Sequence, residues 1–280
     1  MTVPRQKYDN EAYWVDLHDR FGGSLQAVGQ SALSESYNRA KYVSEEFGFE
    51  QALAEVVGNP TDVLEIGAGT GYWTEKMSLR WGLETEITAL DLSERALNAL
   101  HARMPNVRTE TADVGKIDPN SFSNQYDLVT AIMVLLHITD ETQFLSALKL
   151  AANGVRKGGY LVIYEPFLVA KFSPFIGGGY GAAHNKVRRL ETFSVALGNF
   201  GMQLVEMVNG ASWILNSPIE STGRVRFSTM NLVWKSLSVA VYRSEWRSKL
   251  LMPFISLIDR RIRKGKKSAS GKYAIYKKVD

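Results

Sequence analysis

The segment Val63–Trp73 carries the residues whose types and spacing point most directly to chemistry. It reads Val-Leu-Glu-Ile-Gly-Ala-Gly-Thr-Gly-Tyr-Trp, so an apolar run ends in an acid and three glycines follow at alternate positions. Glycine lets the backbone turn sharply and approach a ligand, and the start of a helix presents free N–H groups to the same space. The segment predicts a strand, a ligand-binding loop and a helix in succession.

The spacing of these glycines distinguishes between cofactors. A dinucleotide-binding unit has the pattern G-x-G-x-x-G, which brings a pyrophosphate to the helix N-terminus. Here the pattern is G-x-G-x-G, and Glu65 lies two residues before the first glycine. A carboxylate there would repel a pyrophosphate and attract an ammonium group. The pattern therefore favours a ligand that carries a positive charge.

Two more acids end predicted strands. Asp91 ends the second strand in Ala-Leu-Asp-Leu-Ser, and Asp113 follows the third in Ala-Asp-Val. The carboxyl ends of parallel strands form one edge of a sheet, where ligands bind, so both acids are expected near the glycine loop. Each has a local alternative, since Asp91 could cap the next helix and Asp113 could stabilise a turn.

Together these motifs resemble the class I S-adenosylmethionine (SAM)-dependent methyltransferases, whose first motif is an acidic strand end followed by G-x-G-x-G. The resemblance covers residues 60–166 by motifs, and 184–208 and 273–280 by topology. It implies SAM as cofactor, with Asp91 bonding the ribose hydroxyls, the Asp113 side chain on the adenine amino group and the next backbone amide on the ring. The expected cofactor-binding residues are Glu65, Gly67, Ala68, Gly69, Gly71, Asp91, Leu92, Asp113, Val114, Met133, Tyr37 and Tyr42.

Two segments before this region are similar to a bacterial subgroup of methyltransferase-domain proteins often associated with glycan or natural-product assembly. They are Leu25–Ser31 and Tyr37–Tyr42. Tyr37 and Tyr42 could form a lid across the cofactor. Alternatively, the two rings pack the N-terminal helices onto the core.

Candidate catalytic residues follow from the chemistry of methyl transfer. The reaction is an in-line displacement, so the protein mainly positions two reactants, and a hydroxyl acceptor gains from a base that takes its proton. The candidates are His137, Glu165 and His184. His137 could instead be a helix-start or core residue, Glu165 a cap for the next turn, and His184 a loop residue without a role. His18 and His101 are predicted to lie on the surface.

The elements that would position these residues follow from hydrophobic periodicity. Short apolar runs alternate with helical segments from residue 61 onward, which is typical of an α/β fold. The predicted strands are Asp62–Ile66, Glu86–Leu90, Val107–Thr111, Asp127–Met133, Tyr160–Tyr164, Gln203–Val208 and Tyr273–Lys277, and the intervening helices are Trp73–Trp81, Glu94–Arg103, Asp140–Ala152 and Leu190–Asn199. Gly154 and the Gly158-Gly159 pair are expected to separate the third of these helices from the fifth strand.

The predicted architecture is a Rossmann-like, doubly wound seven-stranded sheet, mostly parallel with an antiparallel last strand. Residues 1–60 would form a helical lid, with helices at Tyr13–Phe21, Ser34–Phe47 and Glu50–Val57. Residues 61–208 and 273–280 would form the SAM-binding core. Residues 209–272 would form a basic helical insertion before the last strand, packed through residues such as Trp234, Leu237, Tyr242, Trp246 and Phe254.

Composition narrows the chemistry. The 280 residues include no Cys and four scattered His, which argues against a thiolate nucleophile and against zinc, while carboxylate-bound Mg²⁺ stays open. Met133-Val134-Leu135-Leu136 occupies the place where methyltransferases of nucleobase amino groups carry Asn-Pro-Pro-aromatic. No apolar run approaches the length that spans a bilayer, and residues 1–10 lack the apolar stretch of a signal peptide, so a cytoplasmic location is expected.

The net charge of +4 conceals a polarised chain. Residues 221–280 contain 15 Lys or Arg and 3 acids, whereas residues 1–220 contain 18 and 26. The basic part could be a solvated edge, a site for an anionic acceptor, or a contact with an anionic membrane, such as the inner membrane face. For the membrane reading, Phe254, Ile255, Leu257, Ile258 and Ile262 form the apolar face beside the basic run. Nucleic acid is the least favoured partner.

The leading hypothesis is a methyltransferase that acts on an oxygen of a small-molecule or glycan-type acceptor in natural-product or polysaccharide biosynthesis. Two alternatives stay open: an amine N-methyltransferase, and a SAM-binding partner without catalysis that docks through its basic insertion. The sequence does not indicate the oligomeric state.

Overall fold

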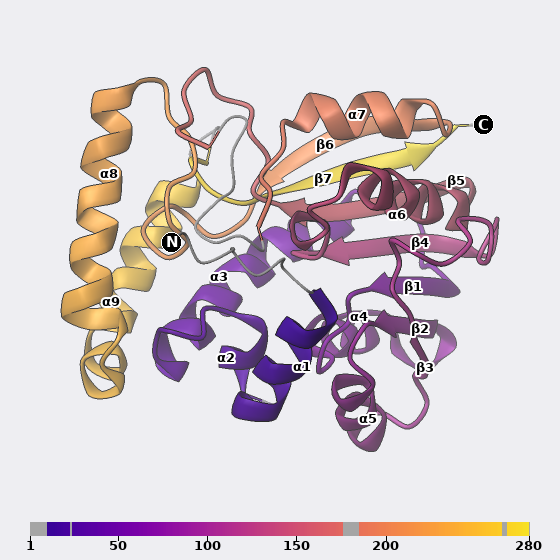
Figure 1. Cartoon of the computed structure of the whole chain (residues 1–280), viewed down its shortest axis with the longest axis horizontal. Coiled ribbons are helices and arrows are strands. Elements are labelled where there is room, and N and C mark those ends of the chain that lie inside the picture. Colours follow the sequence, from indigo (N-terminus) through magenta and orange to yellow (C-terminus); the bar gives the residue numbers. More distant parts are fainter. Residues whose placement is uncertain (1–9, 23, 176–184, 265–267, 280) are drawn as a thin grey trace, which may run out of the picture.

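The computed structural model describes residues 10–22, 24–175, 185–264 and 268–279. Its centre is a seven-stranded sheet in the order β3-β2-β1-β4-β5-β7-β6 (Figure 1). β7 pairs antiparallel with β5 and β6, and the other pairs are parallel. The strands are β1 (Asp62–Ile66), β2 (Glu86–Asp91), β3 (Arg108–Thr111), β4 (Tyr126–Ile132), β5 (Val155–Glu165), β6 (Met202–Asn209) and β7 (Lys272–Lys278). This confirms the predicted Rossmann-like α/β fold with an antiparallel last strand.

Helices between the strands cover both faces of the sheet (Figure 1). They are α4 (Tyr72–Trp81), α5 (Glu94–Arg103), α6 (Glu141–Gly154) and α7 (Leu190–Gly198), with short 3₁₀ turns η1 (Gly82–Glu84) and η2 (Leu135–His137). Phe144 and Phe193 pack on one face of the sheet, and Phe49, Trp73 and Met77 pack on the other. The buried sheet thus fixes the positions of its strand ends, where the candidate site residues lie.

The start of β5 differs from the prediction. The strand begins at Val155, directly after α6, and the Gly158-Gly159 pair lies within it. The pairing with β4 shifts there, from Tyr126 opposite Val155 to Leu128 opposite Tyr160. The predicted turn is therefore an irregularity inside a longer strand, where Gly158 has a φ of +81°.

Three helices precede the sheet: α1 (Asn10–Phe21), α2 (Leu25–Val28) and α3 (Glu35–Ala54). The prediction of two helices over the α3 region was wrong, because α3 runs without a break through Gly48. A Cβ at Gly48 would overlap the carbonyl oxygen of Asn209, so this glycine allows α3 to lie close against β6. It serves close packing and does not end the helix.

The insertion before β7 is helical, as predicted. It contains α8 (Arg224–Leu237), a π-helical turn η3 (Ser238–Tyr242) and α9 (Glu245–Arg263). Tyr242, Met252 and Ile255 pack with Leu33 and Tyr37 of the N-terminal region. Figure 1 shows α8 and α9 at the left, on the side toward which the parallel strands point. The residue limits of the three parts stay a prediction.

Two of the aromatic residues expected to pack the insertion do not do so. Trp246 and Phe254 are 66% and 68% exposed. Both lie on the outer side of α9, because its inner side is occupied by Ser248, Met252, Ile255 and Asp259. Within the described residues, none of the helices has the length and apolar character needed to cross a membrane.

Candidate active site

A cavity of about 900 Å³ lies at the carboxyl ends of β1, β2 and β4. Its floor is formed by three loops, at residues 66–70, 91–92 and 112–114, and by the end of β4 at 132–134. Side chains of α1, the segment 28–32, α3 and α8 line its other sides. This volume is near the upper end of the range for small-molecule sites, so the cavity can hold a cofactor together with a small second substrate.

The glycine loop forms a backbone cradle. The amides of Gly67 and Ala68 donate to the carbonyl oxygen of Leu90, at 2.7 and 2.9 Å, and the amide of Gly69 donates to Oδ2 of Asp91 at 2.8 Å. Gly67 and Gly69 have φ of +74° and +54°. A Cβ at Gly67 would overlap the side chain of Val134, so only glycine fits at this turn.

Gly71 has a different role from the one expected. It is the N-cap of α4 with φ of +87°, and a Cβ there would overlap Leu100 of α5. It is not among the described residues that line the cavity, whereas Gly67, Ala68 and Gly69 are. Gly71 thus lets α4 begin close to α5, and the sequence motif alone does not reveal this difference.

Asp91 lies on the cavity wall beside Leu92. Its Oδ1 accepts a hydrogen bond from the amide of Ser93 at 2.8 Å, and partial burial raises the pKa of its carboxyl, opposed by the backbone donors. The cap of α5 is Ser93, whose hydroxyl oxygen accepts from the amide of Ala96 at 3.2 Å. The alternative in which Asp91 caps this helix is therefore wrong, and Asp91 faces the cavity.

Asp113, Val114 and Met133 also line the cavity. Asp113 stabilises its own turn as well, because Oδ1 accepts from the amide of Gly115 at 3.0 Å and Oδ2 pairs with Lys116 at 2.8 Å. Met133 has a φ of +57°, uncommon for a residue with a side chain, and this conformation turns the chain at the end of β4.

Glu65 is buried behind the glycine loop and is not among the described residues that line the cavity. Its Oε2 accepts from the hydroxyl of Thr74 at 2.5 Å. Its Oε1 has no hydrogen-bond partner among the described residues. Burial raises the pKa of Glu65 to about 8.

The two tyrosines proposed as a lid separate in the structure. Tyr42 lines the cavity and donates its hydroxyl hydrogen to the carbonyl oxygen of Val28 at 3.0 Å. Tyr37 is fully buried away from it, where its ring packs on Tyr242 at 4.6 Å and its hydroxyl bonds the carbonyl oxygen of Leu215. The cofactor-binding role expected for Tyr37 is therefore corrected, because its side chain joins α3 to the insertion.

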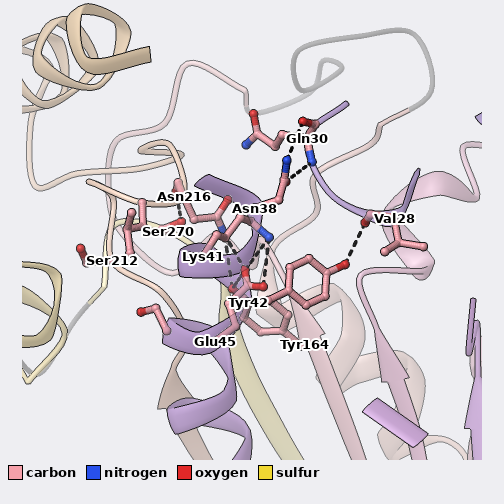
Figure 2. A network of polar contacts seen from close by, with 12 residues as sticks. Val28, Gln30, Asn38, Lys41, Tyr42, Glu45, Tyr164, Ser212, Asn216 and Ser270 are labelled. Carbon is pink, nitrogen blue, oxygen red and sulfur yellow. Dashed lines mark hydrogen bonds and ion pairs between the residues drawn. The ribbon is translucent and has the colours of Figure 1, made fainter. Parts of the chain in front are cut away.

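Figure 2 shows a polar network beside the cavity that sequence reasoning missed. Lys41 Nζ pairs with Glu45 Oε1 at 2.8 Å, and the hydroxyl of Tyr164 and the amide nitrogen of Asn216 donate to the same oxygen at 2.7 and 3.3 Å. Lys41, Glu45 and Asn216 line the cavity. The i, i+4 spacing of Lys41 and Glu45 was the available signal, but it equally describes a solvent-exposed helix pair.

Asn38 holds the segment that covers the cavity. This buried side chain accepts from the amide of Gln30 at 2.8 Å and donates to its carbonyl oxygen at 3.1 Å. Gln30 lies on the cavity wall with its neighbours Gly29 and Ser31. The lid over this part of the cavity is thus a loop fixed by α3.

Among the residues that the structure describes, two histidines line the cavity. His137 lies at the end of η2, and its ring meets the ring of Trp14 edge-on, with centroids 4.8 Å apart. His18 was predicted to be a surface residue, which is wrong: it is buried on α1, near Asp91, and burial lowers its pKa. The i, i+4 spacing of Trp14 and His18 on α1 is the signal that the sequence offered.

Glu165 does not line this cavity. Its Oε1 accepts from the amides of Leu135 and Leu136, at 2.7 and 3.3 Å, and burial raises its pKa to about 8. Its expected role as a base is corrected, because the carboxyl group holds the start of the turn that ends at His137. His184 lies outside the described residues.

The far end of the cavity combines aromatic and amide groups. Phe175, Asn185, Asn231, Trp234 and Lys235 line it. Oδ1 of Asn185 and Nε1 of Trp234 are buried with no hydrogen-bond partner among the described residues. Buried polar atoms normally have a partner, so these two can serve a bound molecule after small adjustments of the side chains.

These residues fit SAM. Gly67 and Gly69, both with positive φ, carry the loop backbone along the cavity wall, and the Asp91 and Asp113 carboxylates lie at neighbouring strand ends. This fold and this set of strand-end residues define a methyltransferase domain of the class I SAM-dependent type, with SAM as its cofactor.

Comparison with known proteins agrees with this class. Residues 63–159 match the family described as Methyltransferase domain. Methyltransferase str2 of Strobilurus tenacellus is 32% identical over 110 residues, which cover 38% of this chain and 36% of that protein. Malonyl-[acyl-carrier protein] O-methyltransferase of Paenibacillus sp. (strain JDR-2) is 32% identical over 105 residues, which cover 36% of this chain and 37% of that protein. The matches thus span little more than a third of either relative.

The fold likeness extends further than the sequence likeness. N-methyltransferase NodS from Bradyrhizobium japonicum WM9, in complex with S-adenosyl-L-homocysteine (SAH), matches with a TM-score of 0.50 and 16% identity, over 87% of this chain and 88% of that one. At this identity the likeness concerns the fold.

Proposed function

We propose that this protein transfers a methyl group from SAM to an oxygen of a small-molecule or glycan-type acceptor. The observation that carries the proposal is the distribution of charge along one continuous cavity. Among its described lining residues, the carboxylates are Glu45, Asp91 and Asp113. Glu45 pairs with Lys41, and the other two lie at the cofactor end.

The cofactor end would hold the methyl donor through Asp91, Asp113 and the glycine loop. When bound, SAM supplies an activated methyl group on a sulfonium. The carboxylates favour the hydroxyl, amino and cationic groups of such a ligand, and Tyr42 with the 28–32 segment keeps water away from it. The residues at this end would therefore bind the methyl donor and orient it.

The acceptor end favours a hydroxyl over an amine. It is lined by the amides of Asn185 and Asn231, the indole of Trp234 and the ammonium of Lys235. A protonated amine gains nothing from a cation there, whereas hydroxyl groups can pair with the partnerless atoms of Asn185 and Trp234. A hydroxylated, neutral or anionic molecule is the acceptor class that this end fits best.

His137 is the base in this proposal. Its imidazole lies on the wall of the cavity, where Trp14 packs against it, and imidazole accepts protons near neutral pH. The acceptor hydroxyl would give its proton to His137 as its oxygen takes the methyl group. Glu165 acts through the turn that carries His137 and does not touch the acceptor.

Cofactor binding is tested by calorimetry with SAH. Asp91→Ala removes a carboxylate from the cavity wall and should weaken binding roughly 10- to 100-fold, the range for one hydrogen bond to a charged group. Asp118→Ala is the matched control, because Asp118 also accepts from the amide two residues on, at 3.0 Å, but is not among the described lining residues. The proposal fails if the intact folded chain does not bind SAH.

Acceptor chemistry is tested with methyl-labelled SAM and a panel of hydroxylated small molecules, oligosaccharides and amines. Label in an oxygen-linked methyl group is expected. His137→Ala should lower kcat by roughly 10²–10⁴-fold and remove the rise of rate with pH, while SAH affinity is retained. Label on amines alone, with a pH–rate profile unchanged by His137→Ala, would contradict the oxygen acceptor.

A further inference from the structure

The outer side of α9 carries an apolar stripe on a basic helix. Trp246, Leu250, Phe254 and Leu257 are 66%, 62%, 68% and 51% exposed, and Ile258 beside them is 46% exposed. Their spacing of four, four and three residues places the first four on one side of the helix. Single exposed apolar residues are ordinary on protein surfaces, but an aligned set of this size marks a contact surface.

This stripe differs from the apolar face expected from the sequence. Ile255 is buried and Ile262 packs on the inner cluster, so neither belongs to the stripe. Trp246 and Leu250 extend it toward the start of α9 instead. The exposed stripe therefore runs over most of the helix, which at 19 residues is roughly 28 Å long.

Buried polar contacts fix the rotation of α9. Asp259 is 1% exposed, and its two carboxylate oxygens accept from the hydroxyl of Ser44 at 2.5 Å and the amide of Ser212 at 2.8 Å. Ser248 is fully buried and bonds Ser34 at 2.8 Å. Turning the stripe inward would break these contacts, so it stays on the surface.

Cations lie at both ends of the stripe. From Arg243 to Lys264 the chain has seven Lys or Arg and two acids, and one of those acids is the buried Asp259. Exposed cations near the start of α9 are Arg243, Arg247 and Lys249, and those near its end are Arg260, Arg261 and Lys264.

We propose that α9 lies flat on an anionic lipid surface, with its apolar stripe among the acyl chains and its cations on the headgroups. An amphipathic helix with Trp, Phe and Leu on one side and Lys or Arg at its borders binds membranes in this way. A second copy of this chain is a poorer occupant, because a symmetric contact would bring the same cations together.

The test is co-sedimentation of the full chain, without SAM or acceptor, with vesicles of phosphatidylcholine alone or with 30% phosphatidylglycerol, on the order of the charge of natural anionic membranes. The chain should pellet with the anionic vesicles at low salt and be released at high salt. Leu250→Ser with Phe254→Ser should weaken binding at least about tenfold, as expected for losing two buried apolar side chains.

The matched control is Leu79→Ser with Leu83→Ser, since these residues are 74% and 86% exposed outside α9. This pair should bind vesicles as the unchanged chain does. Arg260→Ser with Arg261→Ser should reduce both the affinity and its dependence on salt.

Three results would overturn the proposal: no pelleting of the unchanged chain at low salt, equal losses in the stripe and control pairs, or equal binding to neutral vesicles. Light scattering can give a fourth contradicting result. A dimer that Phe254→Ser converts to a monomer would show that a second copy of this chain covers the stripe. Because vesicle binding is measured without any substrate, its outcome is independent of the proposed methyl transfer.

Discussion

Replacing Gly67 by alanine tests whether the cradle exists as the structure shows it. The residue has φ of +74°, and an added Cβ would overlap Val134. The left-handed conformation costs about 1–2 kcal/mol for a residue with a side chain, and overpacking adds roughly 1–3 kcal/mol. Gly67→Ala should therefore lower the free energy of unfolding by roughly 2–5 kcal/mol, measured by urea denaturation.

Gly58→Ala separates the two contributions. Gly58 has φ of +87°, and a Cβ there meets nothing within 4 Å, so this variant carries the conformational cost alone. It should lose about 1–2 kcal/mol. The difference between the variants, roughly 1–3 kcal/mol, is the contact with Val134.

Stabilisation by bound SAH measures how well the Gly67→Ala and Gly58→Ala variants bind the ligand. SAH at about 100 times its Kd should add about 2.7 kcal/mol to the unfolding free energy of the unchanged chain and of Gly58→Ala. Gly67→Ala should show less, because its loop must move away from Val134. Equal losses of stability in both variants, with equal stabilisation by SAH, would refute the cradle.

Two further predictions concern buried carboxyl groups. Glu165→Ala leaves two buried amides without an acceptor, so it should lower the free energy of unfolding by roughly 1–3 kcal/mol in urea denaturation. It should also lower kcat, because the turn that carries His137 is held less firmly. Glu165→Gln keeps an acceptor oxygen, so its stability and kcat should match those of the unchanged chain. Glu65, with its pKa raised from 4.5 to about 8, keeps its proton in the folded state at pH values where the unfolded chain releases it. The contribution of Glu65 to the unfolding free energy should therefore fall between pH 4.5 and about 8, by up to about 1.4 kcal/mol per pH unit. Glu65→Gln should remove this contribution and leave the similar one from Glu165.

Each prediction has an outcome that contradicts it. If Glu165→Gln loses as much kcat as Glu165→Ala, then Glu165 acts as an acid or base and not as a support for the turn. If the stability curves of Glu65→Gln and the unchanged chain stay parallel from pH 5 to pH 8, Glu65 does not keep its proton in the folded protein.

The sequence predicted the elements that depend on local pattern. β1 and α5 have the predicted bounds, because turn residues and periodicity mark both ends. The strand-end acids Asp91 and Asp113 reach the cavity because a parallel sheet places its carboxyl ends along one edge. These features need no knowledge of distant contacts.

Exposure depends on contacts between distant segments, and there the sequence was a poor guide. His18 is buried because α1 packs near Asp91, which no pattern within α1 reveals. Tyr37 packs on Tyr242, some two hundred positions away in the chain. Trp246 faces outward because four other residues, two apolar and two polar, occupy the inner side of α9. Aromatic residues at helical spacing predict that one face of a helix is packed, but they do not show which segment of the chain packs against it.

The polarised charge of the chain gains a direction from these placements. Lys235 is the cation of residues 221–280 on the cavity wall among the described residues, whereas Arg243, Lys249, Arg260 and Arg261 are exposed on or beside α9. One cation on the cavity wall is enough to favour an anionic acceptor. Binding of an acceptor therefore does not explain the other basic residues of the insertion. Since long-range attraction to an anionic surface grows with the number of exposed cations, these exposed cations act together on whatever the outer side of α9 meets. The insertion thus has two separate sides, with α8 lining the cavity and α9 facing outward. Substitutions on α9 should change vesicle binding without changing the affinity for SAH.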